Sequence, residues 1–316
     1  MIATVTLSPA IDKTMIVPGF AVGRTNRGSI ERLDPGGKGI NVAKAVKRLG
    51  YSVVALGFTA GMNGQFISRA LEALDIPVDF VDVPGETRVN LKIEDPEAAT
   101  ETEINEHGFP VGPEHMRQLK ENLAEHAARA KVVVFSGSLP PNAPPDTYAG
   151  LLAIARSHGA HTVLDTSGAA LAEGLKGRPD FVKPNRAEAE ELLHRRLQGE
   201  SELARAVREL LMRGPSMVAI SMGAEGVVAG RGDRVLLASP PRLKTRCSVG
   251  AGDAMVAAFA CAMVANLDFD EAVRMATAMG AATALSSGSS VAGMDAVQAL
   301  LPDVALKQLG EDGRVL

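Results

Sequence analysis

Asp253 stands among residues that have almost no side chains, in the stretch CSVGAGDAMVAAF. The residues that follow it are good helix formers, so we expect a helix to begin near Gly252. The first N–H groups of a helix have no partner within the helix, and the helix dipole makes that end positive. With so little side chain at Gly250, Ala251 and Gly252, an anion such as a phosphate could approach these groups closely.

A carboxylate beside a bound phosphate repels it, so Asp253 makes no sense as a phosphate ligand. It makes sense as a base that takes a proton from a hydroxyl group attacking that phosphate. The alternative is structural, because aspartate is a common cap at the start of a helix. The turn alone leaves both interpretations open, and it is neither a Walker A loop nor a Rossmann glycine motif.

A second group of residues opens another helix, in the stretch DPGGKGINVAKAVKRLG. Gly36 and Gly37 allow a ligand to approach the backbone closely. Lys38 could meet an anion, and Asn41 can both donate to and accept from a hydroxyl group. This combination suits a sugar, and the alternative is a glycine turn followed by a capped helix.

The composition excludes several classes of protein. Of the 316 residues, 46% are hydrophobic and 22% are charged, as in ordinary globular proteins. The net charge of −4 and the lack of a basic stripe with interleaved aromatic residues argue against a nucleic-acid partner. The longest apolar run is too short to span a bilayer, and the first residues do not resemble a signal peptide. Two cysteines cannot build a disulfide framework or a zinc site, so we expect free thiols in the cytoplasm.

Short apolar runs alternate with helical patterns along most of the chain, which predicts a mainly parallel sheet with helices on both faces. The expected strands are 2–7, 52–58, 132–138, 161–166, 180–185 and 217–223. The expected helices are 39–49, 63–74, 113–130, 145–158, 186–193 and 201–213, and then 252–265, 269–286 and 294–301.

Two segments, 15–33 and 87–106, interrupt this alternation. Their sequences, such as TRVNLKIE and ATETEINE, alternate in polarity like exposed strands. We expect them to form a small extra sheet that acts as a lid over the site. The lid would comprise 11–33 and 86–108 of a single domain that spans 1–316.

Taken together, PGGKGINVA and SVGAGDAM resemble the first and second signatures of the PfkB family of carbohydrate kinases, in the same order and at a similar separation. The resemblance covers nearly the whole chain. It implies a ribokinase-like fold, which is a three-layer α/β/α sandwich with a mainly parallel central sheet and a small β-strand lid. It also implies that Asp253 is the catalytic base and that Gly250, Ala251 and Gly252 form the anion hole.

The resemblance extends to further residues. Asp12 in SPAID, which we expect to end the first strand, resembles the aspartate that binds sugar hydroxyls; read alone, it could be a turn residue. Asn185 with Glu188 resembles the N-x-x-E pair that holds Mg²⁺ through water, although Glu188 alone would pass for an exposed helix carboxylate. The residues implied at the nucleotide are Lys183, Asn185, Ser221, Gly223, Gly226 and Ser248, with Gly280 and Ala281 flanking the adenine or merely packing two helices.

Three stretches, GRTNR, ETRVNLKI and SGSLPPN, resemble the branch of the family that phosphorylates sugar phosphates. This implies that Arg88, Lys38 and Ser138 contact the phosphate already on the substrate, and the fork of an arginine suits that role. Glu103 stands near the place where the 6-phosphofructokinase pattern has a second phosphate-binding arginine. The resemblance therefore favours ATP-dependent phosphorylation of D-fructose 1-phosphate at its 6-hydroxyl, although Ser8 replaces an asparagine common in that subfamily.

Other functions stay open. Tagatose 6-phosphate or fructose 6-phosphate could be the substrate, and a sensor could bind a sugar phosphate without chemistry, although the intact GAGD argues against a sensor. The family implies ATP and Mg²⁺ as cofactors, with K⁺ near Ser286–Ser290 as a further candidate. Lid strands often pair between subunits in relatives, so a homodimer is the expected assembly.

Overall fold

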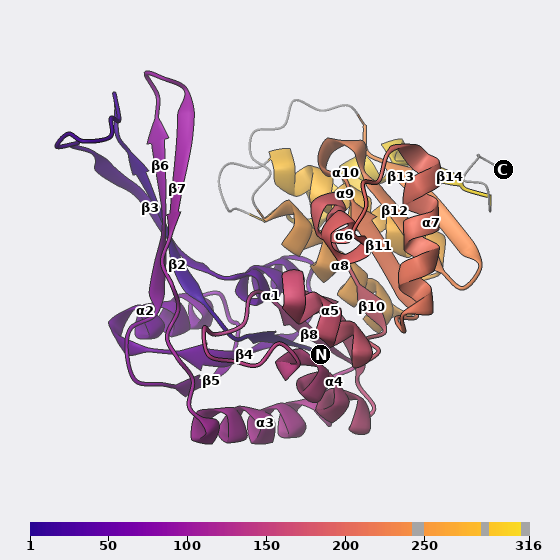
Figure 1. Cartoon of the computed structure of the whole chain (residues 1–316), viewed down its shortest axis with the longest axis horizontal. Coiled ribbons are helices and arrows are strands. Elements are labelled where there is room, and N and C mark those ends of the chain that lie inside the picture. The colour runs from indigo at the N-terminus through magenta and orange to yellow at the C-terminus, as the bar shows by residue number, and fades with distance from the viewer. Residues whose placement is uncertain (242–249, 286–290, 311–316) are drawn as a thin grey trace.

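The computed structural model describes residues 1–241, 250–285 and 291–310. They form a ten-stranded sheet between two layers of helices, with a separate four-stranded sheet beside them (Figure 1). The large sheet has the order β14-β13-β12-β11-β10-β9-β8-β1-β4-β5. Its strands are parallel from β11 to β5 and antiparallel from β11 to β14. The predicted α/β architecture with a mainly parallel sheet is confirmed.

The strands of the large sheet have the following bounds: β1 (Ile2–Thr6), β4 (Val53–Thr59), β5 (Val78–Asp82), β8 (Val132–Ser136), β9 (His161–Asp165), β10 (Phe181–Val182), β11 (Met217–Ser221), β12 (Val227–Arg231), β13 (Arg234–Ser239) and β14 (Ala305–Gln308). The six expected strands are all present. Strand β5, the β12–β13 hairpin and β14 were not expected from the sequence.

Each face of the large sheet has its own apolar core, because successive residues of a strand point to opposite sides. In β4, for example, Val53 belongs to one core and Val54 to the other. The helices of the first face are α1 (Lys38–Arg48), α2 (Gly61–Glu72), α8 (Ala251–Ala265), α9 (Phe269–Leu285) and α10 (Met294–Leu300). Those of the second face are α3 (Pro113–Ala127), α4 (Thr147–Ser157), α5 (Gly168–Lys176), α6 (Arg186–Leu193) and α7 (Gly199–Met212).

Local signals set several helix bounds. Helix α1 ends at Arg48, and Gly50 adopts a left-handed conformation (φ 82°) just beyond it, as its position after the expected helix predicts. Helix α8 begins at Ala251 after Gly250, which also has a positive φ of 79°. The all-round burial of α8 explains its run of alanines, because α1 and α9 both pack closely against it.

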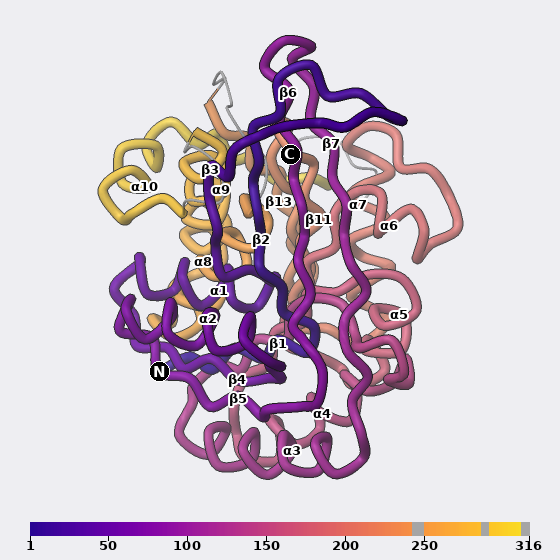
Figure 2. The backbone as a smooth tube through the Cα atoms, turned by 90° about the vertical axis from the view of Figure 1, so that its left-hand side faces the viewer, coloured from indigo at the N-terminus to yellow at the C-terminus, as the bar shows by residue number. Residues whose placement is uncertain are grey.

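The small sheet has the order β3-β2-β6-β7 and is built from β2 (Ala10–Ile16), β3 (Ser29–Gly36), β6 (Arg88–Asp95) and β7 (Thr100–Asn105). It rises from the body as two long hairpins (Figures 1 and 2). Strand β2 follows β1 after a short turn, and β3 runs through Gly37 into α1. The small sheet is therefore joined to the body at the start of α1 and at the carboxyl end of β1.

The two faces of the small sheet differ in character. Thr14 pairs in register with Arg32 and Lys92, and this polar row faces the body. The next row on the other face includes Leu33 and Ile104, which are 44% and 51% exposed.

Asp95 joins the far ends of the two hairpins. Its carboxylate accepts hydrogen bonds from the backbone N–H groups of Gly19 and Phe20, at 2.9 Å each, in the loop after β2. It also accepts from Glu97 and Ala98 in the turn after β6. These four bonds hold the pKa of Asp95 below its ordinary value against the effect of burial.

Among the described residues, none of the helices combines the length and apolar character needed to cross a lipid bilayer.

Candidate active site

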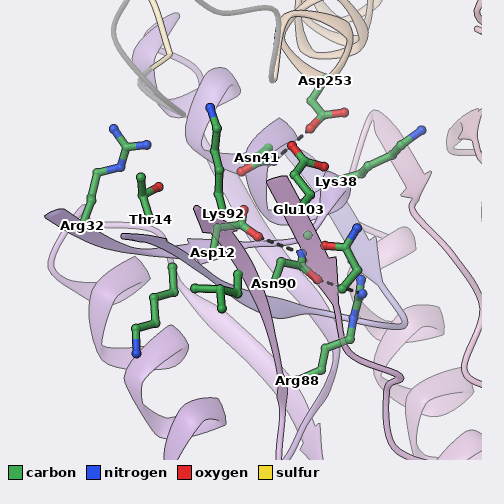
Figure 3. A pocket seen from close by; sticks show the side chains of 14 residues that line it. Asp12, Thr14, Arg32, Lys38, Asn41, Arg88, Asn90, Lys92, Glu103 and Asp253 are labelled. Carbon is green, nitrogen blue, oxygen red and sulfur yellow. Dashed lines mark hydrogen bonds between the residues drawn. The ribbon is translucent and has the colours of Figure 1, made fainter. Parts of the chain in front are cut away.

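A cleft of about 280 Å³ lies between the small sheet and the start of α1 and α8 (Figure 3). It brings together residues that are far apart in the sequence. Its lining residues are Asp12, Lys13, Thr14, Arg32, Gly37, Lys38, Asn41, Arg88, Asn90, Leu91, Lys92, Glu103, Asn105 and Asp253. Six of the residues expected from the sequence are in this set.

Asp253 lies in the first turn of α8 and is only 8% exposed. Its Oδ2 accepts a hydrogen bond of 2.9 Å from Nδ2 of Asn41 in α1 (Figure 3). Burial, and then the nearby charge of Asp165, raise the pKa of Asp253 to about 6. Its side chain makes no capping hydrogen bond to α8, so the structural alternative of a simple helix cap is not what the geometry supports.

Asn41 has one polar atom left over. Its Oδ1 is buried and has no hydrogen-bond partner among the described residues. A buried amide oxygen without a partner costs free energy, so it is a suitable acceptor for a ligand hydroxyl.

Gly36 and Gly37 connect β3 to α1 and are needed for steric reasons. A Cβ atom at Gly36 would lie 2.2 Å from Oδ2 of Asp12. Gly37 has a φ of 106°, and a Cβ there would lie 3.1 Å from Cγ2 of Thr6. Any side chain at Gly36 would therefore displace the Asp12 carboxylate from its place in the cleft.

Asp12, Asn90 and Arg88 form a hydrogen-bonded row on the small sheet (Figure 3). Asn90 donates to Oδ1 of Asp12 at 2.8 Å and accepts from Nη1 of Arg88 at 3.0 Å. The expectation that Asp12 ends the first strand is wrong, and so is the turn alternative, because β1 ends at Thr6 and Asp12 lies within β2. Burial raises the pKa of Asp12 above its ordinary value, although Asn90 acts in the opposite direction.

Asp165, at the carboxyl end of β9, is a residue that sequence reasoning missed. It is 1% exposed, and its Oδ2 accepts a 2.9 Å hydrogen bond from Ser136. Nζ of Lys183 lies 3.4 Å from its Oδ1, and Nζ of Lys38 lies 3.6 Å from its Oδ2. Its place at the end of a buried parallel strand was a usable signal, because sites of α/β sheets lie at that edge.

Lys183 links this cluster to α8. A Cβ atom at Gly252 would lie 3.5 Å from Nζ of Lys183. The ammonium group therefore sits beside the first turn of α8, where unpaired N–H groups already favour an anion.

A profile of the "pfkB family carbohydrate kinase" family matches residues 5–296. The chain belongs to this kinase family. It is 39% identical over 309 residues to the 1-phosphofructokinase of Rhodobacter capsulatus, with 98% of each chain covered. It is 35% identical over 309 residues to the 1-phosphofructokinase of Bacillus subtilis, covering 98% of this chain and 100% of the relative.

The solved structure of phosphofructokinase-2 from Escherichia coli in complex with potassium has the same fold as this kinase-family chain. The TM-score is 0.91 at 30% identity, covering 96% of this chain and 98% of the other. The predicted ribokinase-like fold and the predicted family are therefore confirmed.

Asn185 and Glu188, the pair that the family pattern associates with Mg²⁺, form a capping box at the start of α6. Oδ1 of Asn185 accepts from the backbone N–H of Glu188 at 2.9 Å, and Oε2 of Glu188 accepts from the N–H of Asn185 at 2.8 Å. Oε1 of Glu188 lies 3.9 Å from Nζ of Lys38, on the side of the cleft. One carboxylate oxygen is thus left for a hydrated cation, and no cage of three or more acidic, His or Cys ligands exists among the described residues.

The remaining nucleotide residues lie further along the same sheet edge. Ser221 ends β11 and forms an isolated bridge with Asn185. Gly223 has a φ of 60° with open space around it, whereas a Cβ at Gly226 would lie 2.0 Å from the backbone oxygen of Ala238. Gly226 is therefore needed for packing against β13.

Three other expectations have different outcomes. Ser138 is exposed and does not line the cleft. Ser248 and the expected K⁺ region Ser286–Ser290 lie outside the described residues. A Cβ at Gly280 would lie 3.2 Å from Cε of Met255, which shows close packing of α9 on α8.

The cleft also contains residues that were not expected, among them Asn90, Thr14, Arg32 and Lys92. The alternation of TRVNLKIE places Arg88, Asn90 and Lys92 on one face of a strand. Once Arg88 is assigned to the site, this two-residue alternation predicts that Asn90 faces the site as well.

Proposed function

We propose that this protein transfers the terminal phosphoryl group of ATP to the 6-hydroxyl of D-fructose 1-phosphate, which gives fructose 1,6-bisphosphate. The observation that carries the proposal is that Asp253, Asp12 and Arg88 line one cleft beside the start of α8. A base, a hydroxyl-binding carboxylate and a phosphate-binding guanidinium are the groups that the reaction needs to bind and activate its acceptor. The two curated relatives named 1-phosphofructokinase support this choice of substrate.

In the proposed mechanism, Asp253 takes the proton from the attacking hydroxyl, and the bond from Asn41 holds its carboxylate in place. The N–H groups at Gly250, Ala251 and Gly252 bind the phosphoryl group during transfer. Its raised pKa makes Asp253 a better proton acceptor than an ordinary carboxylate while it is still ionised at neutral pH.

The acceptor sugar is held by the small sheet and by α1. Asp12 and Asn41 bind its hydroxyl groups, with the Gly36–Gly37 turn close against it. Arg88 binds the phosphate already present, aided by Lys38, whereas Ser138 lies outside the cleft and is given no role in the proposed binding. The small sheet acts as the lid that excludes water, so that ATP is not hydrolysed in place of the sugar.

The donor side is formed by the edge of the large sheet. Lys183 and Asn185 lie near the ATP phosphates, and Ser221, Gly223 and Gly226 form the nucleotide loop. The geometry at Glu188 fits Mg²⁺ held through water, and this ion would offset the charge of the phosphates. A K⁺ requirement stays a prediction.

The decisive experiment is a panel of ketose phosphates with ATP and Mg²⁺, read as ADP release. We expect kcat/KM to be highest for fructose 1-phosphate. A higher value for tagatose 6-phosphate or fructose 6-phosphate would make that compound the substrate in place of fructose 1-phosphate. No ADP release with any of them would indicate a sensor. The solved relative named phosphofructokinase-2 is the reason to include fructose 6-phosphate.

We also propose a homodimer formed through the small sheet, in a cytoplasmic enzyme that draws on cytoplasmic ATP. The apolar face of the sheet supports this, because Ile30, Leu33 and Ile104 are 54%, 44% and 51% exposed in the single chain. Sedimentation analysis of Leu33→Lys should show monomer if these residues form the contact. A dimer that persists would place the contact elsewhere.

A further inference from the structure

Asp165 is enclosed by cations and by one hydroxyl group. It is 1% exposed at the carboxyl end of β9, beside Ser136 of β8 and Lys183 just after β10. Lys38 reaches it from the first turn of α1. A buried carboxylate that meets two ammonium groups and a hydroxyl donor is one whose ionised form the fold has stabilised.

The contacts to the two lysines are longer than ordinary charged hydrogen bonds. The distances of 3.4 Å to Lys183 and 3.6 Å to Lys38 exceed the about 2.7–2.9 Å typical of such bonds. Oδ1 of Asp165 has no hydrogen bond of normal geometry among the described residues. Both ammonium groups are thus attracted to Asp165 and still have N–H donors to offer a ligand.

The two lysines lie at the starts of two helices. Lys183 is beside Gly252 in the first turn of α8, and Lys38 is the first residue of α1 and lines the cleft. Both helix starts carry unpaired N–H groups that favour anions. Asp165 therefore sits behind the two places where the donor and acceptor phosphates are expected.

Other roles for Asp165 fit less well. It does not line the cleft, so it cannot take a proton from a bound hydroxyl. Its oxygens face Lys183, Lys38 and Ser136, so its contacts among the described residues are with two ammonium groups and one hydroxyl group.

We propose that Asp165 is a positioning residue that keeps Lys38 and Lys183 aligned at the two helix starts for phosphoryl transfer. This rests on the proposed kinase function. Burial acts to raise the pKa of Asp165, but the two lysines and Ser136 outweigh it and hold the pKa below its ordinary value. For Lys38, the effect of burial is likewise outweighed by Asp165 and Glu188, so its pKa is raised.

The test is Asp165→Asn, which preserves the shape of the side chain and removes its charge. We expect kcat to fall about 10- to 100-fold, because displacement of a charged group by about 1 Å can cost that much. The KM for the sugar phosphate should rise by a smaller factor than kcat falls, because Lys38 is proposed to help bind its phosphate, whereas the contacts of Asp12, Asn90 and Arg88 do not involve Asp165.

A pH profile separates positioning from a merely structural effect. Asp165 raises the pKa of Asp253, whereas Lys38 and Lys183 lower it. Loss of the Asp165 charge with both lysines in place should therefore move the acid limb of kcat/KM to lower pH, and displacement of the lysines should oppose that shift. The charged groups that act on Asp253 are Asp165 of β9, Lys38 and Lys44 of α1 and Lys183 after β10. The other charged residues that line the same cleft are Lys13, Asp12, Arg32, Arg88, Lys92 and Glu103.

Asp180→Asn is the matched control. Asp180 accepts hydrogen bonds from the N–H and Oγ1 of Thr162, at 2.7 and 3.0 Å, near the other end of β9. It touches neither lysine, so kcat and the acid limb should stay within about twofold of wild type. If Asp165→Asn keeps wild-type kcat, or loses it with an acid limb moved to lower pH as expected for lysines that stay in place, the proposal is overturned.

The proposed function is judged on the wild-type protein alone. If that protein phosphorylates no ketose phosphate, crystal structures of wild type and Asp165→Asn still decide the positioning role. Lysine ammonium groups that leave the two helix starts in the variant would support it. Ammonium groups that stay in place would refute it.

Discussion

The acceptor side and the donor side of the cleft are held together in different ways. On the acceptor side, Arg88, Asn90 and Asp12 are joined by hydrogen bonds of 3.0 and 2.8 Å. On the donor side, Lys183 approaches Asp165 only to 3.4 Å, and Lys38, which also lines the acceptor cleft, approaches it only to 3.6 Å. One side is fixed by directional bonds between neighbouring strands, and the other is held by charge between separate elements.

This difference between the two sides of the cleft matches the chemistry of the groups that each side would bind. A sugar presents hydroxyl groups at fixed angles, so the groups that bind it gain from fixed directions. A phosphoryl group in transfer carries charge that moves between oxygens, so ammonium groups with unused donors suit it better. Asp253 lies between the two sides, with Asn41 on one and Asp165 on the other.

The largest effect is expected where the two sides meet. Asp253→Asn should lower kcat by about 10²- to 10⁴-fold, because a positioned base typically contributes that much. Binding of the sugar phosphate, measured by calorimetry, should survive because Asp12 and Arg88 are unchanged. A variant with near-normal kcat would mean that another group takes the proton.

The acceptor side is tested by Arg88→Lys, which keeps the charge and loses the two-pronged donor. We expect KM for the sugar phosphate to rise about tenfold, because lysine cannot reproduce bidentate contacts to phosphate. The KM for ATP should stay constant in the same steady-state assay, since Arg88 contacts only the acceptor side. A rise in both would show that the two sides are not separable.

The protonation of Asp253 should be visible in the pH profile of the wild type. Only the ionised carboxylate can accept a proton, and its pKa is raised to about 6. The value of kcat/KM should therefore rise as the pH increases through about 6 and become constant at higher pH. A limb near pH 4 would indicate a carboxylate that is not buried when the enzyme is free.

The smallest effect concerns stability. Because folding raises the pKa of Asp253 from 3.8 to about 6, its contribution to stability is present at low pH and is lost as pH rises through 6. At pH 8 the buried charge costs at most about 3 kcal/mol. Asp253→Asn should thus have a Tm a few degrees above wild type at pH 8.

The same melting experiment at pH 4 provides the control. There the wild-type carboxyl group is protonated, and the two proteins should melt within about a degree of each other. A variant that is less stable at pH 8 would show that Lys38 and Lys183 depend on the charge of Asp253.

Much of the fold could be predicted because the buried parallel strands are apolar runs between helical patterns. The elements that were missed have weaker signals. Strand β5 (VDFVD) is short and half-polar, and the β12–β13 hairpin is held by pairing with β11 and by packing of α7. The sequences of these strands at or near the edges of the large sheet do not show which neighbouring elements stabilise them.

The glycines of the candidate site and Asp253 could be predicted from the sequence. Residues with little side chain at the start of a helix indicate that a ligand approaches the backbone there. Asp165 and Asn90 were not found, since their significance lies in distant partners. Asp165 meets Lys38 across 127 positions of the chain, and no local pattern encodes that contact. Gly226 shows the converse, because a Cβ atom at this position would clash with the backbone of Ala238, and the motif does not suggest this packing reason.

The carboxylate of Asp95 gives the two hairpins of the small sheet a common tip. The loop after β2 and the turn after β6 both donate hydrogen bonds to this one side chain, so the ends of the two hairpins should move together. Flexing is then left to the roots of the strands, where Asp12 and Arg88 stand. If the small sheet moves as one rigid body, Asp12 and Arg88 would move over the sugar together.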